Sequence, residues 1–148
     1  MPTPTPTSTP RLVVDASTLL ALALGPGPRA DAIAAHVAAS DLHAPALLPF
    51  EIANVLRRQR LAGRLERTEA EQLERALARL PIELWPHEVV ADRVRELGDV
   101  LTAYDGSYVA LAEHLDATLL TTDRRLAAAP GLRCAVVIPD PHSAPSPA

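Results

Sequence analysis

The chain has 148 residues, which is enough for one domain with a buried core. A formal net charge of −4 excludes a protein that coats nucleic acid non-specifically through a basic surface. All of its basic residues other than His are Arg, and the absence of Lys excludes a P-loop and Schiff-base chemistry, since both depend on a Lys amine.

Both ends of the chain are rich in Pro and small polar residues. Residues 1–10 alternate Pro with Thr and Ser, and residues 139–148 have a similar composition, so we expect disordered tails around a folded domain at 11–138. No signal peptide and no apolar run of membrane-spanning length is visible, which predicts a cytoplasmic protein without membrane contact. The single Cys134 lies in an apolar run and is predicted to be a buried structural thiol.

Strand-length apolar runs alternate with helix-length amphipathic runs along the folded part. The Gly-Pro-Gly-Pro run at 25–28 and Gly63 predict breaks, and Thr68 followed by Glu71 predicts a capping box. In chain order we expect a strand at 11–15, helices at 16–23 and 29–39, a strand at 42–45, helices at 47–62 and 69–79, a strand at 82–85, helices at 88–97 and 105–115, a strand at 117–121, a helix at 123–129 and a strand at 134–138.

This alternation predicts an α/β fold. Short apolar strands separated by helices form a central, mainly parallel sheet of about five strands with helices on both faces, a three-layer α/β/α sandwich. In such folds ligands bind at the carboxyl ends of the strands.

Four acidic residues are predicted to lie near that edge of the sheet. Asp15 ends the first strand, Asp123 follows the fourth strand, and Glu51 and Asp105 lie at the starts of helices. Converging carboxylates repel one another unless a cation is present, and oxygen ligands favour hard ions such as Mg²⁺ or Mn²⁺. Taken singly, Asp105 and Asp123 also fit helix N-caps, and Glu51 fits a solvated acid of a first helical turn.

Four segments carry a resemblance to a known family. Residues 13–17 (VVDAS), 49–56 (PFEIANVL), 104–112 (YDGSYVALA) and 120–126 (LTTDRRL) resemble the four motifs of PIN domains, in the family's order. The residues of these segments and their spacing are most similar to those of VapC toxins of type II toxin–antitoxin systems. Gly106 departs from the family pattern, where Ala is commoner, but it removes no ligand.

The resemblance implies a PIN-like fold and a Mg²⁺- or Mn²⁺-dependent endoribonuclease that cleaves RNA, with tRNA or ribosomal RNA as expected targets. It carries the catalytic and metal-binding roles to four carboxylates: Asp15, Glu51, Asp105 and Asp123. Ser17 and Thr121 match positions that line the site. Asn54, one helical turn after Glu51, is either a further lining residue or an ordinary polar helix residue.

The family also implies partners. A cognate VapB-like antitoxin would lie across the acidic site, and VapC proteins tend to form homodimers. The apolar face of residues 47–62 and the neighbouring helices could serve either partner. Arg124 and Arg125 are candidate contacts to RNA phosphates, whereas the Arg residues of 57–67 fit a solvated helix face paired with Glu. No His lies in a motif, so metal-activated water is the expected nucleophile.

Three rival interpretations remain at this point. The chain could be another PIN-type metal-dependent nuclease that acts on DNA or in RNA processing, or a catalytically inactive PIN domain that only binds. A phosphoacceptor signalling domain also uses Asp and Mg²⁺ on a parallel sheet, but the absence of Lys disfavours it.

Overall fold

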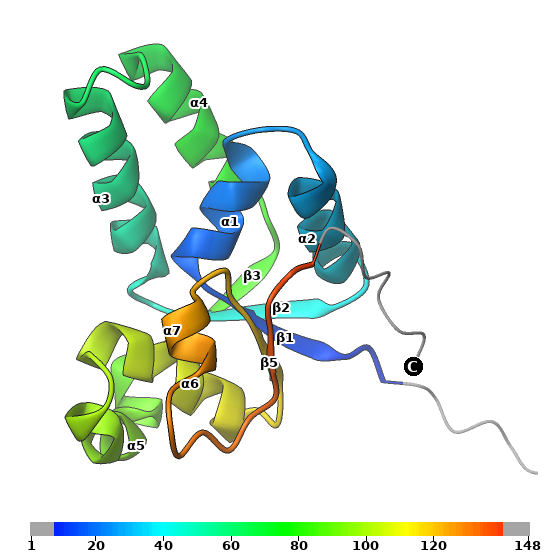
Figure 1. Cartoon of the computed structure of the whole chain (residues 1–148), viewed down its shortest axis with the longest axis vertical. Coiled ribbons are helices and arrows are strands. Elements are labelled where there is room, and N and C mark those ends of the chain that lie inside the picture. The colour runs from blue at the N-terminus through cyan, green and yellow to red at the C-terminus, as the bar shows by residue number, and fades with distance from the viewer. Residues whose placement is uncertain (1–7, 141–148) are drawn as a thin grey trace, which may run out of the picture.

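The computed structural model describes residues 8–140, and the predicted tails lie largely outside this range, at 1–7 and 141–148 (Figure 1). In the described part, the strands are β1 (Arg11–Val14), β2 (Asp41–Pro45), β3 (Ile82–Trp85), β4 (Thr118–Leu120) and β5 (Val136–Val137). The α-helices are α1 (Ala16–Ala23), α2 (Pro28–Ala38), α3 (Leu48–Leu61), α4 (Arg67–Ala78), α5 (Ala91–Glu96), α6 (Ala103–His114) and α7 (Arg124–Ala127).

The strands form one parallel sheet in the order β3-β2-β1-β4-β5. Helices α1 to α4 pack together on one face and α5 and α6 on the other, which confirms the predicted α/β/α sandwich (Figure 1). β1 is the central strand, and Leu12, Val13 and Val14 are buried, as expected for a parallel strand covered on both faces. Because β4 lies beside β1 in parallel, the residues that follow the two strands meet at one edge.

Helix α6 passes through the core. Every residue from 106 to 112 is buried, and Tyr108 is only 2% exposed. Its contacts with β1, β2 and β4 hold the helix against the sheet. The first turn of α6 is therefore held rigidly at the edge where β1 and β4 end.

Several predicted boundaries are wrong. Helix α6 begins at Ala103, and Thr102 caps it by accepting a hydrogen bond from the backbone N–H of Asp105, so Asp105 is a first-turn residue and not the cap. The predicted helix at 88–97 is shorter, because the 3₁₀ turns η1 (His87–Val89) and η2 (Leu97–Asp99) flank α5. The predicted last strand is reduced to Val136–Val137, and Cys134 lies before it, half-buried.

The capping box is also two residues earlier than predicted. Helix α4 begins at Arg67, and the Glu69 carboxylate accepts a hydrogen bond from the backbone N–H of Glu66 at 2.8 Å. The Thr68 and Glu71 pair has the required spacing, but both residues lie within α4, so Thr68 does not cap the helix. Identical spacing at two neighbouring positions made the sequence ambiguous.

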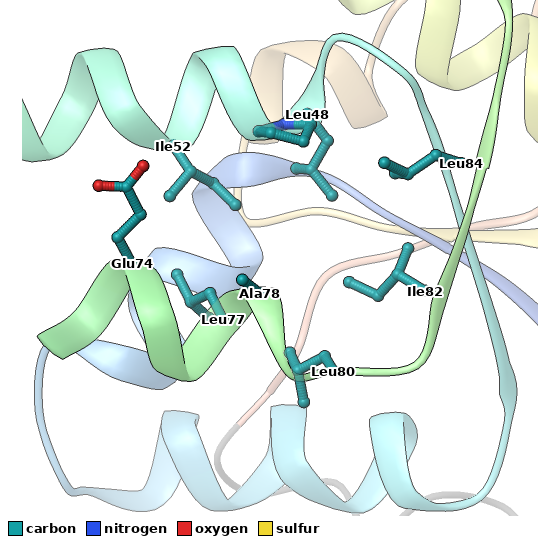
Figure 2. Close-up of a pocket in the computed structure, with 9 residues that line it drawn as sticks. Leu48, Ile52, Glu74, Leu77, Ala78, Leu80, Ile82 and Leu84 are labelled. Carbon is teal, nitrogen blue, oxygen red and sulfur yellow. The ribbon is translucent and has the colours of Figure 1, made fainter. Parts of the chain in front are cut away.

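An apolar groove lies between the α3–α4 hairpin and the edge strand β3 (Figure 2). Its volume is about 270 Å³. Ile52, Leu77, Leu80 and Ile82 point into the same space, with Glu74 at the rim (Figure 2). Leu84 of β3 also lines it and is 45% exposed, so this apolar surface is open to solvent.

Candidate active site

Asp15 joins the end of β1 to the start of α1. Its side chain is 7% exposed and caps α1, since Oδ1 accepts hydrogen bonds from the Thr18 N–H and the Ser17 hydroxyl, each at 2.8 Å. Oδ2 accepts a hydrogen bond from the hydroxyl of Thr121, which follows β4. A buried carboxylate with this many donors is held in one orientation.

A chain of hydroxyl groups ties the loop after β4 to the loop after β1. Thr121 Oγ1 also accepts a hydrogen bond from the backbone N–H of Asp123 at 3.0 Å. Thr122 Oγ1 donates to Ser17 Oγ at 2.8 Å, and Ser17 donates in turn to Asp15. Ser17 and Thr121 therefore both contact Asp15, and Thr122, which the sequence analysis did not name, contacts Ser17.

Glu51 lies in the first turn of α3 and is held by α6. The buried Tyr108 hydroxyl donates a hydrogen bond to Glu51 Oε2 at 2.5 Å. Burial and the Glu51 carboxylate raise the pKa of the Tyr108 hydroxyl well above its usual value. The Tyr108 hydroxyl is therefore protonated at neutral pH and can donate this hydrogen bond.

Three of the carboxylates interact electrostatically. Burial raises the pKa of Glu51 above its usual value, the Tyr108 hydrogen bond lowers it in part, and the charges of Asp105 and Asp15 raise it further. The Asp105 side chain is partly exposed and, within residues 8–140, makes no hydrogen bond or ion pair. The acidic edge thus combines three carboxylates: Asp15 is held by several hydrogen bonds, Glu51 is held by Tyr108, and Asp105 is free to turn.

Asp123 faces a different set of partners. Its Oδ1 accepts hydrogen bonds from the N–H groups of Arg125 (2.8 Å) and Leu126 (3.4 Å) and caps α7. Burial alone would raise the pKa of Asp123, but these bonds and the Arg125 guanidinium, 3.4 Å from Oδ2, hold it below its usual value. The backbone N–H of Asp123 contacts Thr121 at the acidic edge, while the Asp123 carboxylate caps α7.

The described residues contain no preformed metal cluster. As they stand between residues 8 and 140, no three His, Cys, Asp or Glu side chains are close enough to share one ion. The donor set is nevertheless all oxygen, and Mg²⁺ is commonly held by one or two carboxylates together with waters and phosphate oxygens. Two carboxylates from among Asp105, Glu51 and Asp15 are enough protein ligands for such a site.

A hollow of about 350 Å³ opens beside Glu51. Asn54 lines it, one helical turn further along α3. Arg58, Phe50 and Tyr104 line the same hollow, and the sequence analysis assigned none of these three to the site.

The sequence analysis gave no role to Tyr108, since the spacing of Tyr108, Leu111 and Leu115 along the predicted helix is that of core-facing residues. A buried Tyr usually has a hydrogen-bond partner for its hydroxyl, and that rule could have pointed to a nearby acid. Arg124 and Arg125 are both exposed, and the side chain of Arg125, which pairs with Asp123, is 93% exposed.

The comparisons with known proteins agree with this geometry. The family model of the PIN domain matches residues 12–132. VapC ribonuclease Mb0985 of Mycobacterium bovis is 37% identical over 127 residues, which cover 86% of this chain and 97% of that protein. The crystal structure of PAE2754 from Pyrobaculum aerophilum superposes with a TM-score of 0.64 and 27% identity, covering 86% of this chain and 83% of that one.

A further solved structure shares the fold alone. The crystal structure of VapBC2 from Rickettsia felis, bound to a DNA fragment from the VapBC2 promoter, matches with a TM-score of 0.60 at 11% identity. The match covers 86% of this chain and 97% of that one. A sandwiched parallel sheet with an acidic edge formed after β1 and β4 defines a PIN-type α/β protein. The chain belongs to the PIN-domain family, and its identity to Mb0985 over nearly all of that protein places it in the VapC group.

Within residues 8–140, no helix combines the length and the apolar character that crossing a membrane requires.

Proposed function

We propose that this chain is a divalent-metal-dependent endoribonuclease and the toxin of a toxin–antitoxin pair. The observation that carries the proposal is the group formed by Glu51, Asp105 and Asp15, in which the charges of two carboxylates raise the pKa of the third. Membership of the VapC group supports RNA as the substrate. Cleavage of cellular RNA would take place in the cytoplasm, and tRNA or ribosomal RNA are the proposed targets.

The metal site would be built from three side chains that differ in how tightly hydrogen bonds hold them. Asp15 presents a fixed carboxylate, because Ser17, Thr18 and Thr121 hold it. Asp105 can turn toward an ion without breaking any hydrogen bond, and Glu51 stays oriented by Tyr108. A bound Mg²⁺ or Mn²⁺ would supply Lewis-acid stabilisation of the phosphate and activate water for attack.

Asp123 differs from the other three acids. Its Oδ1 already accepts hydrogen bonds from the N-terminus of α7, and its Oδ2 lies 3.4 Å from the Arg125 guanidinium, so an ion would compete with Arg125 for Oδ2. We therefore propose that Asp123 contributes mainly by shaping the loop that positions Thr121, and that it reaches the ion only if the exposed Arg125 side chain moves away from Oδ2. The Asp123→Asn variant keeps a side-chain oxygen that can cap α7, so retention of at least a tenth of the parent cleavage rate would support the indirect role.

Arg124 and Arg125 follow this loop on the solvent side and are proposed to contact RNA phosphates. Replacing both residues with Gln should weaken RNA binding and make it less dependent on salt. With fewer phosphate contacts, fewer counterions are released from the RNA when it binds. Unchanged binding and an unchanged salt slope would reject this role.

The decisive experiment compares single carboxylate variants of the purified chain. The parent, Asp105→Asn and Asp15→Asn are incubated with total cellular RNA and with single-stranded DNA in Mn²⁺, in Mg²⁺ and in EDTA. Asp105→Asn is the sharper variant, because the Asp105 carboxylate holds no part of the fold, whereas Asp15 also caps α1. The matched control is Asp99→Asn, which removes an exposed carboxylate in η2.

We expect metal-dependent RNA fragments with the parent and with Asp99→Asn, and none with Asp105→Asn or Asp15→Asn. Mn²⁺ should also raise the melting temperature of the parent, and Asp105→Asn should weaken this effect without any RNA present. Cleavage of DNA alone would favour another PIN-type nuclease. No cleavage together with no melting shift in Mn²⁺ would favour an inactive binding module.

We also propose a VapB-like antitoxin as partner and a homodimer as the resting state. The open groove between the α3–α4 hairpin and β3 supports a protein partner, since an amphipathic helix buries its apolar face in a groove of this kind (Figure 2). Light scattering of the isolated chain and of the co-expressed pair measures both assemblies. Leu84→Arg should weaken whichever contact covers the groove, and unchanged masses for both would show that the groove serves neither.

A further inference from the structure

The distribution of aromatic residues is unusual for this chain. It has one Trp, one Phe and two Tyr, and two of these four, Phe50 and Tyr104, are exposed at 74% and 64%. Aromatic side chains gain most of their stabilising free energy from burial, so exposed rings contribute little to this fold. An aromatic-poor sequence that leaves half of its rings in solvent points to a role outside the core.

The two exposed rings lie together although they are far apart in the sequence. Phe50 is in the first turn of α3 and Tyr104 is in the first turn of α6, and both line the hollow of about 350 Å³ that also contains Glu51. Each ring directly precedes one of the acids in the chain, since Glu51 follows Phe50 and Asp105 follows Tyr104. The rings therefore border the place where the phosphate that is cut would lie.

Apart from the rings and Glu51, the hollow is lined by the apolar Ala16, Leu47 and Val55 and by two polar side chains. Asn54 offers an amide that can both donate and accept hydrogen bonds, and Arg58 offers a guanidinium. Arg58 is exposed and forms no ion pair with any residue between 8 and 140, so the solvated Glu-paired face expected for this helix does not account for it. Flat aromatic faces, an amide and a free cation are the groups that recognise a base and its phosphate.

We propose that Phe50 and Tyr104 form a stacking platform for an unpaired base next to the phosphate that is cut, with Arg58 on a neighbouring phosphate. This inference rests on the proposed function and deepens it, because it assigns the substrate class. Bases inside an RNA duplex are stacked on each other and cannot reach the rings, whereas bases in loops and single strands can. The platform thus selects unpaired segments of RNA.

The test measures binding separately from cleavage. Fluorescence anisotropy in the Asp105→Asn background reports affinity for single-stranded RNA oligonucleotides that carry one 2-aminopurine, and for the same oligonucleotides annealed as duplexes. Phe50→Ala and Tyr104→Ala remove one ring each, whereas Phe50→Tyr and Tyr104→Phe keep a ring. Leu61→Ala is the matched control, because Leu61 is 62% exposed at the far end of α3 and does not line the hollow.

Each Ala variant should lose roughly 5- to 150-fold in affinity for the unpaired RNA, the range expected for one lost stack. The aromatic replacements should restore binding, duplex affinity should not change, and the 2-aminopurine should be quenched by the parent rings but not by the Ala variants. With the Asp105 carboxylate restored, the Ala substitutions should raise KM more than they lower kcat.

Equal affinity and equal quenching in all variants would overturn the proposal, as would equal losses for duplex and unpaired RNA. Weaker binding of an antitoxin with unchanged RNA binding would also overturn it, since the rings would then serve a protein partner. Failure of the proposed function looks different, because the parent would cut no RNA whatever the effect of the rings on binding.

Discussion

Tyr108→Phe tests the link between the core and the acidic edge. The ring of Tyr108 is 2% exposed and would remain packed, so the substitution removes only the hydroxyl that donates to Glu51 Oε2. A hydrogen bond to a charged group contributes about 1.5–3 kcal/mol, and water can partly replace the lost donor because Glu51 is partly exposed. We therefore expect a loss of about 1.5 kcal/mol, or a melting temperature lower by roughly 3–6 °C for a domain of this size.

The pH dependence of this loss has a definite sign. The hydrogen bond favours the ionised form of Glu51 and so lowers a pKa that burial raises. Its contribution is full at neutral pH and is lost as the pH falls through the Glu51 pKa, which lies above the ordinary value of 4.5. Urea denaturation of parent and variant at neutral pH and near pH 4, both in EDTA, measures the difference.

Tyr104→Phe is the matched control, because it removes a hydroxyl from an exposed Tyr in the first turn of the same helix. It should change the free energy of unfolding by less than about 0.5 kcal/mol. If Tyr108→Phe were as stable as the parent at neutral pH, the contact to Glu51 would have no energetic weight. A loss of equal size at both pH values would show that the bond does not depend on the Glu51 charge.

Three further substitutions probe other parts of the argument. Without metal, Glu51→Gln should raise the melting temperature above pH 4.5, because the raised pKa of Glu51 makes its ionised form unfavourable in the folded state. Thermal unfolding in EDTA across pH 4–8 should show that the increase in melting temperature becomes larger as the pH rises. Gly106→Ala should stabilise the protein by about 1 kcal/mol in urea denaturation, since an added Cβ would meet Val94 Cγ1 at an ordinary 3.8 Å; a loss would mean that α6 packs more tightly there. Glu113→Gln should lower the free energy of unfolding by about 2 kcal/mol at neutral pH, because it breaks the 2.6 Å ion pair with Arg93. Burial raises the pKa of Glu113, but the bonds to Arg93 hold it below its usual value, so the loss should become smaller in acid. A loss that does not depend on pH would contradict the ion-pair account.

The sequence determined the class of fold and the order of its acidic residues. Runs such as Leu12–Val14 are short, apolar and followed by helical periodicity, and these are local patterns that predict a parallel sheet with helices on both faces. Since the carboxyl ends of parallel strands share an edge, the placement of Asp15 and of the loop that contains Asp123 at one edge followed from chain order alone.

Only the tertiary structure decided how the side chains meet. Glu51 and Tyr108 are 57 residues apart and Asp15 and Thr121 are 106 apart, and no local periodicity encodes such contacts. The sequence left two roles open for the Asp123 carboxylate, because capping a helix and binding a metal call for the same residue type at the same place, and only the structure shows that it caps α7. Pairing across the core depends on how helices pack on the sheet, and that packing is a property of the whole chain, whereas propensity and pattern act over a few residues.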